Sequence, residues 1–199
     1  MQMKTALFVD GGYLRACSKG AGHVYDNAFI EKFAHSCFIG DEYLFRIFYY
    51  DAPEYKGKVT LPVSGGETTF QSSDKWLTDL AKLERFAVRR GTIGFRGWRP
   101  KNIPIAGAAL TDGDFAPAFE QKGVDMRIGL DIATFSDQAS VHRVVLVSGD
   151  TDMIPAMKHA RKAGLEVGLI QLAAPAHSLH NTLKAHSDFV RHVGWPDAA

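Results

Sequence analysis

The stretch Val144–Asp152 has the sequence VVLVSGDTD, in which a run of apolar, β-branched residues stops at a glycine between polar residues. A run of this length that is apolar on both faces is typical of a strand buried in a parallel sheet. The following residues predict a helix, because Thr151 or Asp152 can cap it and its first turn accepts Pro155. Gly164 then supplies a signal that ends a helix. A strand followed by a helix is the repeating unit of an α/β fold.

The same alternation extends along the chain. Short apolar runs predict further strands at Thr5–Val9, Tyr43–Tyr50, Phe86–Arg90 and Leu165–Ile170. The alternating pattern of Phe86–Arg90 (FAVRR) places that strand nearer a sheet edge. Strands that alternate with helices imply right-handed crossovers and an α/β sandwich.

Helical spacing and capping residues predict helices at Asn27–Phe38, Ser72–Leu83 and Val124–Phe135. Asn27 is the expected cap of the first, and Ser72 or Ser73 that of the second. The third helix carries one apolar stripe, formed by Met126, Leu130 and Ala133.

The chain has 199 residues, of which 46% are hydrophobic, with 23 Lys and Arg against 22 Asp and Glu. A chain of this length and composition can bury a sizeable core, which argues against a disordered, collagen-like or coiled-coil protein. Without an internal repeat or a dividing linker, residues 1–199 are expected to form one domain. Gly and Pro residues concentrate in residues 52–70 and 93–120, which we predict to be long loops.

The sequence indicates a cytoplasmic protein without a membrane segment. No uninterrupted apolar run approaches the roughly 18 residues that a membrane-spanning helix needs. The first apolar run is followed directly by Asp10, which is not typical of a signal peptide. Cys17 and Cys37 are too few for a disulfide framework, so a reducing compartment is expected.

Acidic residues follow the ends of two predicted strands. Asp10 ends the first apolar run, and Asp150 and Asp152 follow the run VVLV. In a parallel sheet both positions lie at the same edge, beyond the carboxyl ends of the strands, where ligands bind. Asp125 begins the helix that leads into VVLV and can face the same edge. Singly, these acids are equally well explained as turn residues or helix caps, but together they indicate a site.

Four carboxylates gathered in this way repel one another. Two unit charges ~4 Å apart cost about 4 kcal/mol at an effective dielectric of about 20. A proton or a cation must offset this repulsion at neutral pH. Oxygen ligands select hard ions, so Mg²⁺ or Mn²⁺ is the expected cofactor. A metal beside open water lowers the pKa of a bound water and so provides a nucleophile for phosphodiester attack.

Three sequence blocks occur in a characteristic order: Phe8–Leu14 (FVDGGYL), Gln121–Asp125 (QKGVD) followed by Leu130-Asp131, and Val145–Asp152 (VLVSGDTD). With these blocks the chain resembles the NYN domain over roughly Lys4 to Phe189. More narrowly, it resembles the LabA-like branch of bacterial NYN proteins, within the PIN-like nuclease superfamily.

The resemblance implies a three-layer α/β/α sandwich with a central, mainly parallel sheet, and an acidic Mg²⁺-dependent centre that cleaves RNA. The implied catalytic and metal-binding residues are Asp10, Asp125, Asp150 and Asp152. The residues expected to support them are Asp131, Ser148 and Thr151. The chain departs from the family pattern at Tyr13, where many relatives have Asn, and this puts a polar contribution from that position in doubt.

A basic segment with interleaved aromatic residues precedes the QKGVD block. Guanidinium groups can contact phosphates, and exposed rings can stack on unpaired bases. The candidate RNA-binding residues are Arg89, Arg90, Arg96, Trp98, Arg99, Lys101 and Lys122. The alternative interpretation of this segment is a solvated helix face that runs into an ordinary loop.

The sequence therefore favours a metal-dependent endoribonuclease that hydrolyses RNA phosphodiester bonds, with RNA as its partner. One alternative is a catalytically weak PIN-like module that binds RNA or a protein. Another is a phosphatase of the haloacid dehalogenase type, although that class needs a second Asp where Gly12 stands. The oligomeric state is open, and a homodimer is compatible with the sequence.

Overall fold

The computed structural model of the chain describes residues 2–40, 42–103 and 109–196. Its centre is a parallel sheet of six strands in the order β10-β9-β8-β1-β2-β5. The strands are β1 (Met3–Asp10), β2 (Glu42–Asp51), β5 (Phe86–Arg90), β8 (Arg143–Val147), β9 (Glu166–Leu172) and β10 (Phe189–Val193). All five predicted strands are present, and β5 lies at a sheet edge as predicted, whereas β10 was not predicted.

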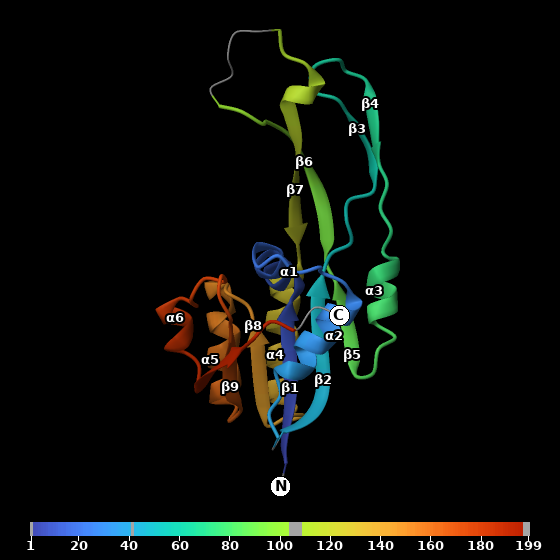
Figure 1. Cartoon of the computed structure of the whole chain (residues 1–199). Coiled ribbons are helices and arrows are strands. Elements are labelled where there is room, and N and C mark those ends of the chain that lie inside the picture. Colours follow the sequence, from blue (N-terminus) through green and yellow to red (C-terminus); the bar gives the residue numbers. More distant parts are fainter. Residues whose placement is uncertain (1, 41, 104–108, 197–199) are drawn as a thin grey trace.

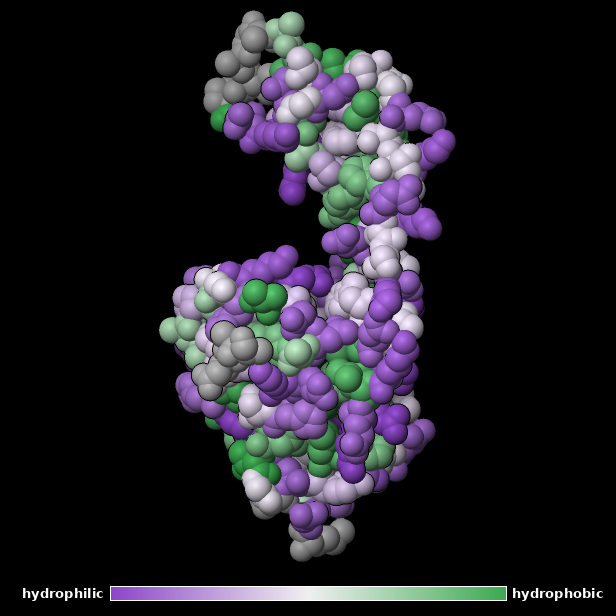
Figure 2. Space-filling model, turned by 45° about the vertical axis from the view of Figure 1, so that its right-hand side comes forward, coloured by the Kyte–Doolittle hydropathy of each residue, from purple (hydrophilic) through white to green (hydrophobic). Residues whose placement is uncertain are grey.

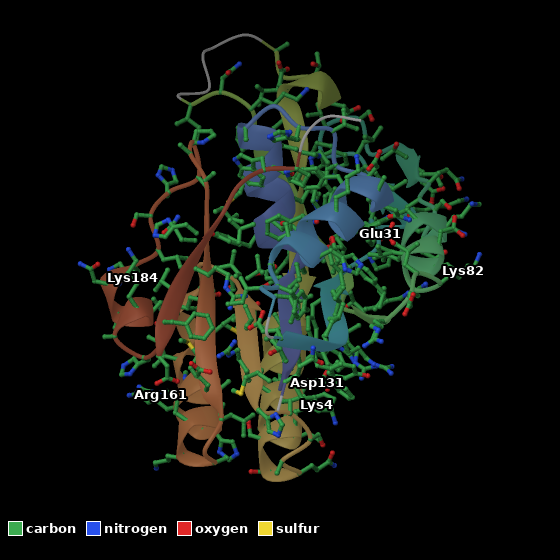
Figure 3. All side chains as sticks on the ribbon, turned by 60° about the horizontal axis from the view of Figure 1, so that its bottom comes forward. Lys4, Glu31, Lys82, Asp131, Arg161 and Lys184 are labelled. Carbon is green, nitrogen blue, oxygen red and sulfur yellow. The ribbon has the colours of Figure 1, made fainter. Side chains whose placement is uncertain are left out.

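Helices cover both faces of the sheet and confirm the three-layer α/β/α sandwich (Figure 1). One face carries α1 (Gly11–Gly20), α2 (Asn27–Ser36) and α3 (Lys75–Leu80). The other carries α4 (Val124–Asp137), α5 (Ile154–Lys162) and α6 (Asn181–Lys184). In Figure 3, Lys184 of α6 and Lys82, which follows α3, lie at opposite sides of the molecule. Of the helices in the described ranges, none has the length and apolar character needed to span a membrane.

Successive side chains of β1 enter two separate cores. Phe8 packs among the residues of the α4 and α5 layer, while Leu7 and Val9 pack against α1, α2 and α3. All three side chains are fully buried. Because helices cover both faces, the strand is a continuous apolar run without the polar alternation of a half-exposed strand.

The structure corrects several predicted helix starts. The sequence analysis missed α1, because a Gly-Gly pair after an aspartate is typical of a turn. Instead Asp10 accepts a hydrogen bond from the Tyr13 backbone N–H at 3.1 Å and caps the helix. Asp26, not Asn27, caps α2, and α3 begins only at Lys75. In each case an aspartate one position outside the helix occupies the cap position.

The predicted apolar stripe of α4 faces outward. Met126 is 71% exposed and Leu130 is 60% exposed. The apolar residues that α4 buries are Val124, Ile128 and Ile132, on the neighbouring stripe. Both stripes have helical spacing, so periodicity alone could not decide which one packs on the sheet.

The two segments predicted as loops form paired strands instead. Residues 52–70 contain an antiparallel pair, β3 (Gly57–Thr60) and β4 (Glu67–Phe70). Residues 93–120 overlap a second pair, β6 (Thr92–Pro100) and β7 (Phe115–Lys122), although residues 104–108 fall outside the described ranges. We call the described residues of these two ribbons, 55–70, 92–103 and 109–122, the arm. It extends from the carboxyl ends of the central strands, and Figure 2 shows an open hollow between its outer end and the body.

An aromatic cluster holds the two ribbons of the arm together. Its rings, with neighbouring centroids 5.3–6.4 Å apart, belong to Tyr55, Phe70, Phe95, Trp98 and Phe119. A β-bulge in β6 at Gly97 (φ 95°) turns Phe95 and Trp98 to the same face, although three positions separate them. The Trp98 indole N–H also donates to the Thr60 carbonyl at 2.8 Å. The arm thus has a small core of its own.

Two glycines at the start of α1 offer a test of packing between this helix and the sheet. A Cβ on Gly11 would lie 2.5 Å from the Tyr49 hydroxyl and 2.8 Å from an Asp51 oxygen. The closest atom to a Cβ on Gly12 would be 3.4 Å away. We therefore expect Gly11→Ala to lower the free energy of unfolding by about 1–3 kcal/mol. Gly12→Ala is the control and should be neutral or slightly stabilising. Urea unfolding measures both, and equal effects would contradict the observed packing.

Candidate active site

The acidic residues predicted from the sequence lie where the strand order reverses. The chain leaves β1 toward β2 and β5 on one side and returns to β8 and β9 on the other. Strands β1 and β8 pair in parallel, with Val9 opposite Val147. Asp10 and the Ser148–Asp152 segment therefore leave the sheet side by side. This reversal is the usual ligand-binding position in open α/β sheets.

Asp10 is held in place by groups from two elements. It is 9% exposed, and its carboxylate accepts hydrogen bonds from Tyr13 N–H at 3.1 Å and from the Ser148 hydroxyl at 3.5 Å. The same Ser148 oxygen accepts from the Asp150 backbone N–H at 3.1 Å. Ser148 is fully buried and so connects the end of β1 with the turn after β8.

The other three predicted acids begin helices. Asp150 accepts a hydrogen bond from the Asp152 N–H at 2.8 Å and caps a 3₁₀ turn, Thr151–Met153, that leads into α5. Thr151 and Asp152 are exposed at this turn. Asp125 lies in the first turn of α4, exposed to solvent.

The electrostatics of these acids show that they influence one another. The pKa of Asp10 is raised from 3.8 to about 6, mainly by burial and also by the charges of Asp125 and Asp51, while backbone hydrogen bonds act in the opposite direction. Burial also raises the pKa of Asp125, with added repulsion from Asp150 and Asp152. The structure therefore brings the four predicted acids into one electrostatically coupled group.

Asp51 is a fifth acid at this edge that the sequence analysis missed. It ends β2, is fully buried, and receives two hydrogen bonds from the Arg15 guanidinium at 2.5 and 3.1 Å. The Tyr49 hydroxyl donates to it at 3.1 Å and also shares a 2.6 Å hydrogen bond with the Tyr25 hydroxyl. The signal was available, because Asp51 ends the run YLFRIFYY just as Asp10 ends the first apolar run.

The donor chemistry of the site fits a hard divalent cation. The four acids offer only carboxylate oxygens, and their mutual repulsion is the kind that a cation relieves. However, within the described ranges no three His, Cys, Asp or Glu side chains converge closely enough to form a ready-made metal-binding group. A cation would therefore have to draw the exposed carboxylates of Asp125 and Asp152 inward.

Asp131 lies away from this group and ties α4 to the sheet. It accepts hydrogen bonds from the Tyr50 hydroxyl at 2.7 Å and from Arg89 Nε at 3.0 Å. The Arg89 guanidinium also lies over the Phe48 ring, 5.6 Å from its centroid. Figure 3 labels Asp131 on its helix. These contacts give both Asp131 and Arg89 a role in joining α4, β2 and β5.

The remaining basic candidates divide between the body and the arm. Arg90 binds Asp74 and, at 2.7 Å, the Thr78 hydroxyl, and so joins β5 to α3. On the arm, Arg96 and Lys122 both pair with Glu120.

Two other candidates, Arg99 and Lys101, are exposed at the outer part of β6 and just beyond it, where Lys101 donates to the Gly113 carbonyl at 2.7 Å. Trp98, in contrast, is half-buried in the aromatic cluster, where its ring packs against Phe70 and Phe95.

Tyr13 packs against the turn that carries Asp150. A Cβ on Gly149 would lie 2.7 Å from the Tyr13 ring, so only a glycine fits beneath it. The aromatic residue at this position thus covers the backbone of the Ser-Gly-Asp turn with its ring.

Comparison with known proteins agrees with the fold described above. A model of the NYN domain family matches residues 4–191. The crystal structure of a protein of unknown function from Vibrio parahaemolyticus is similar to the chain, with a TM-score of 0.56 and 15% sequence identity. The likeness covers 98% of this chain and 94% of that one, and at this identity it shows the fold alone. No curated protein gave a significant match. The family match does not specify a branch, so the LabA-like assignment stays a prediction.

The raised pKa of Asp10 makes a prediction about stability. Because the pKa of Asp10 is about 6 in the folded chain and 3.8 in the unfolded chain, stability is lost as the pH rises from about 4 to about 6, and the loss is complete above pH 6. Replacing Asp10 with Asn, which still caps α1, should raise the free energy of unfolding at pH 7.5 in EDTA by up to about 3 kcal/mol. Below pH ~4 the acid is protonated in both states, so the gain should vanish. Urea unfolding at both pH values checks this, with Glu31→Gln on α2, the same change from carboxylate to amide away from the site, as the control.

Proposed function

The chain belongs to the NYN domain family, and from this premise we propose that it is a metal-dependent endoribonuclease that hydrolyses RNA phosphodiester bonds. NYN domains are part of the PIN-like superfamily, are generally nucleases and typically act on RNA. The observation that carries the proposal is the coupled group of Asp10, Asp125, Asp150 and Asp152 at the reversal of strand order.

The four acids would together hold Mg²⁺ or Mn²⁺. When bound, such a cation would polarise the phosphate and supply a water of lowered pKa as the nucleophile. Asp10 and Asp150 are fixed by their hydrogen bonds within the fold, whereas Asp125 and Asp152 face solvent, where a phosphodiester can approach. An anionic substrate alone would be repelled by these carboxylates, which is why the proposal includes a cation.

The arm would bind the RNA backbone beside this centre. Its β6–β7 ribbon leads directly through Lys122 and Gly123 into α4, so the ribbon begins next to Asp125. Arg99 is exposed on this ribbon, and its charge can replace a counterion at a phosphate, whereas Arg96 is exposed but already pairs with Glu120. Since Trp98 is packed within the arm, this contact would rest on charge and would be independent of sequence.

Two observations favour the catalytically weak binding module as the second candidate. The acids do not form a ready-made metal-binding group in the described ranges, and Tyr13 covers the Ser-Gly-Asp turn with an apolar ring. A protein of this kind would bind RNA through the arm without cleaving it. No observation favours the phosphatase, because Gly12 offers no carboxylate in the first turn of α1.

Asp150→Asn separates the two candidates. The amide keeps an acceptor for the Asp152 N–H and so preserves the cap, but it removes one negative charge from the site. We expect the cleavage rate of a fluorescent single-stranded RNA in Mn²⁺ to fall by about a hundredfold or more, with weaker Mn²⁺ binding by calorimetry. Asp137→Asn, on the exposed end of α4, should leave both unchanged. Wild-type cleavage by Asp150→Asn would refute the proposed role of that residue. A wild-type chain that binds RNA but never cleaves it would support the binding module.

The role of the arm predicts a change in salt dependence. Arg99→Ala removes one exposed cation, so the slope of log affinity against log salt for single-stranded RNA should become shallower by about 0.7. Lys184→Ala removes a cation from α6, on another side of the molecule, and should leave the slope unchanged. Binding is measured in EDTA, so that cleavage does not interfere. An identical slope for Arg99→Ala and the wild type would exclude a phosphate contact at this residue.

A further inference from the structure

A pocket lies on the face of the sheet that α1, α2 and α3 cover. It is a pocket of about 1040 Å³ between α1, the starts of α2 and α3, and the base of the arm. None of the four acids of the proposed catalytic group lines it. Its volume suits a flat organic group the size of a nucleoside, with room to spare.

Aromatic rings from α3 and from both ribbons of the arm line this pocket. Trp76 of α3 stands on one side, and Phe70 and Phe119 of the arm belong to the other. Phe119 is 42% exposed although it belongs to the aromatic cluster of the arm, so part of its ring is free to contact a ligand. Rings that are placed by rigid elements and left partly exposed are suited to stack on a flat heterocycle.

The charges of the pocket do not favour a phosphate. Arg15 is paired with buried Asp51, and Lys75 is paired with Asp79 at 2.5 Å. Lys19 and the carboxylate of Glu54 also line the pocket and carry opposite charges. A surface with balanced charge and aromatic walls binds an uncharged heterocycle better than an anion.

The pocket adjoins the acidic centre through α1 and the base of the arm. Arg15 lies five residues after Asp10 on one helix, about 7.5 Å along its axis. The Gln121 side chain lies 3.6 Å from where a Cβ of Gly12 would be. Gln121 and Phe119 are two residues apart on β7 and so share one face of the ribbon. An RNA strand bound at the acidic centre would therefore reach Phe119 by passing Gln121.

We propose that this pocket binds an unpaired nucleobase of the RNA, close to the phosphodiester held at the acidic centre. This inference rests on the proposed nuclease function. Phe119 of the arm then helps to determine which phosphodiester bond of the RNA is cleaved. A base held in a duplex cannot enter the pocket, so the protein should select single-stranded RNA or loops.

Nucleotide binding can be tested without cleavage. In EDTA, adenosine 5′-monophosphate should shift the backbone amide NMR signals of Gln71, Trp76 and Phe119, whereas ribose 5-phosphate should not. Phe119→Ala should weaken this binding about tenfold, because it removes one stacking ring. Met126→Ala, on the exposed face of α4, is the matched control and should bind as the wild type does.

Other results would overturn the proposal. These are an absence of shifts up to high millimolar nucleotide, shifts confined to the acidic centre, or unchanged affinity in Phe119→Ala. Shifts caused by N-acetyl-tryptophanamide but not by the nucleotide would assign the pocket to a protein partner.

A cleavage assay keeps this test separate from that of the proposed function. Phe119→Ala should raise the KM for single-stranded RNA while kcat stays near the wild-type value. If the wild type does not cleave RNA but the nucleotide still causes the NMR shifts, the proposed nuclease function is refuted and the proposed base pocket is supported. If Phe119→Ala cleaves RNA normally with an unchanged KM, the proposed binding of a base in the pocket is refuted and the proposed nuclease function is supported.

Discussion

Burial of an ionisable carboxylate beside other carboxylates is the constraint on which the candidate site depends. Asp10 sits at the end of the central strand, 9% exposed, and its pKa is raised to about 6. The Tyr13 backbone N–H and the Ser148 hydroxyl that donate to Asp10 offset only part of the cost of burying its charge. A cation bound at this edge of the sheet would offset the cost of ionising the buried carboxylate at neutral pH, and this is the physical reason for the proposed metal site.

Because the central strands are parallel, the two ribbons of the arm and the aromatic pocket lie at the same edge of the sheet as the acids. The β3–β4 ribbon leaves from the end of β2 and the β6–β7 ribbon from the end of β5, and these two strands are hydrogen-bonded neighbours. The ribbons therefore emerge side by side, and aromatic residues from both can pack together into the arm. The same arrangement places the base of the arm beside α1 and creates the aromatic pocket next to the acids.

Different parts of the site were accessible to sequence reasoning to different degrees. The location of the four acids at one edge of the sheet could be predicted because each follows a strand or starts a helix, and these are local signals. Asp51 followed the same rule but was missed among the aromatic residues of its strand. Trp98 and Arg89 were chosen for their chemistry, yet Trp98 packs within the arm and Arg89 pairs with Asp131. Nothing in the order of residues shows whether a ring or a guanidinium already has a partner inside the fold.

The sequence by itself determined the alternation of strands and helices, the parallel sheet and the positions of the acids. These follow from short-range patterns of apolar residues, caps and strand ends. Tertiary structure alone decided which stripe of α4 is buried, that two Gly- and Pro-rich segments pair into an arm, and that a pocket opens beside α1. Those outcomes depend on contacts between residues far apart in the chain, whose free energy arises only when the segments meet.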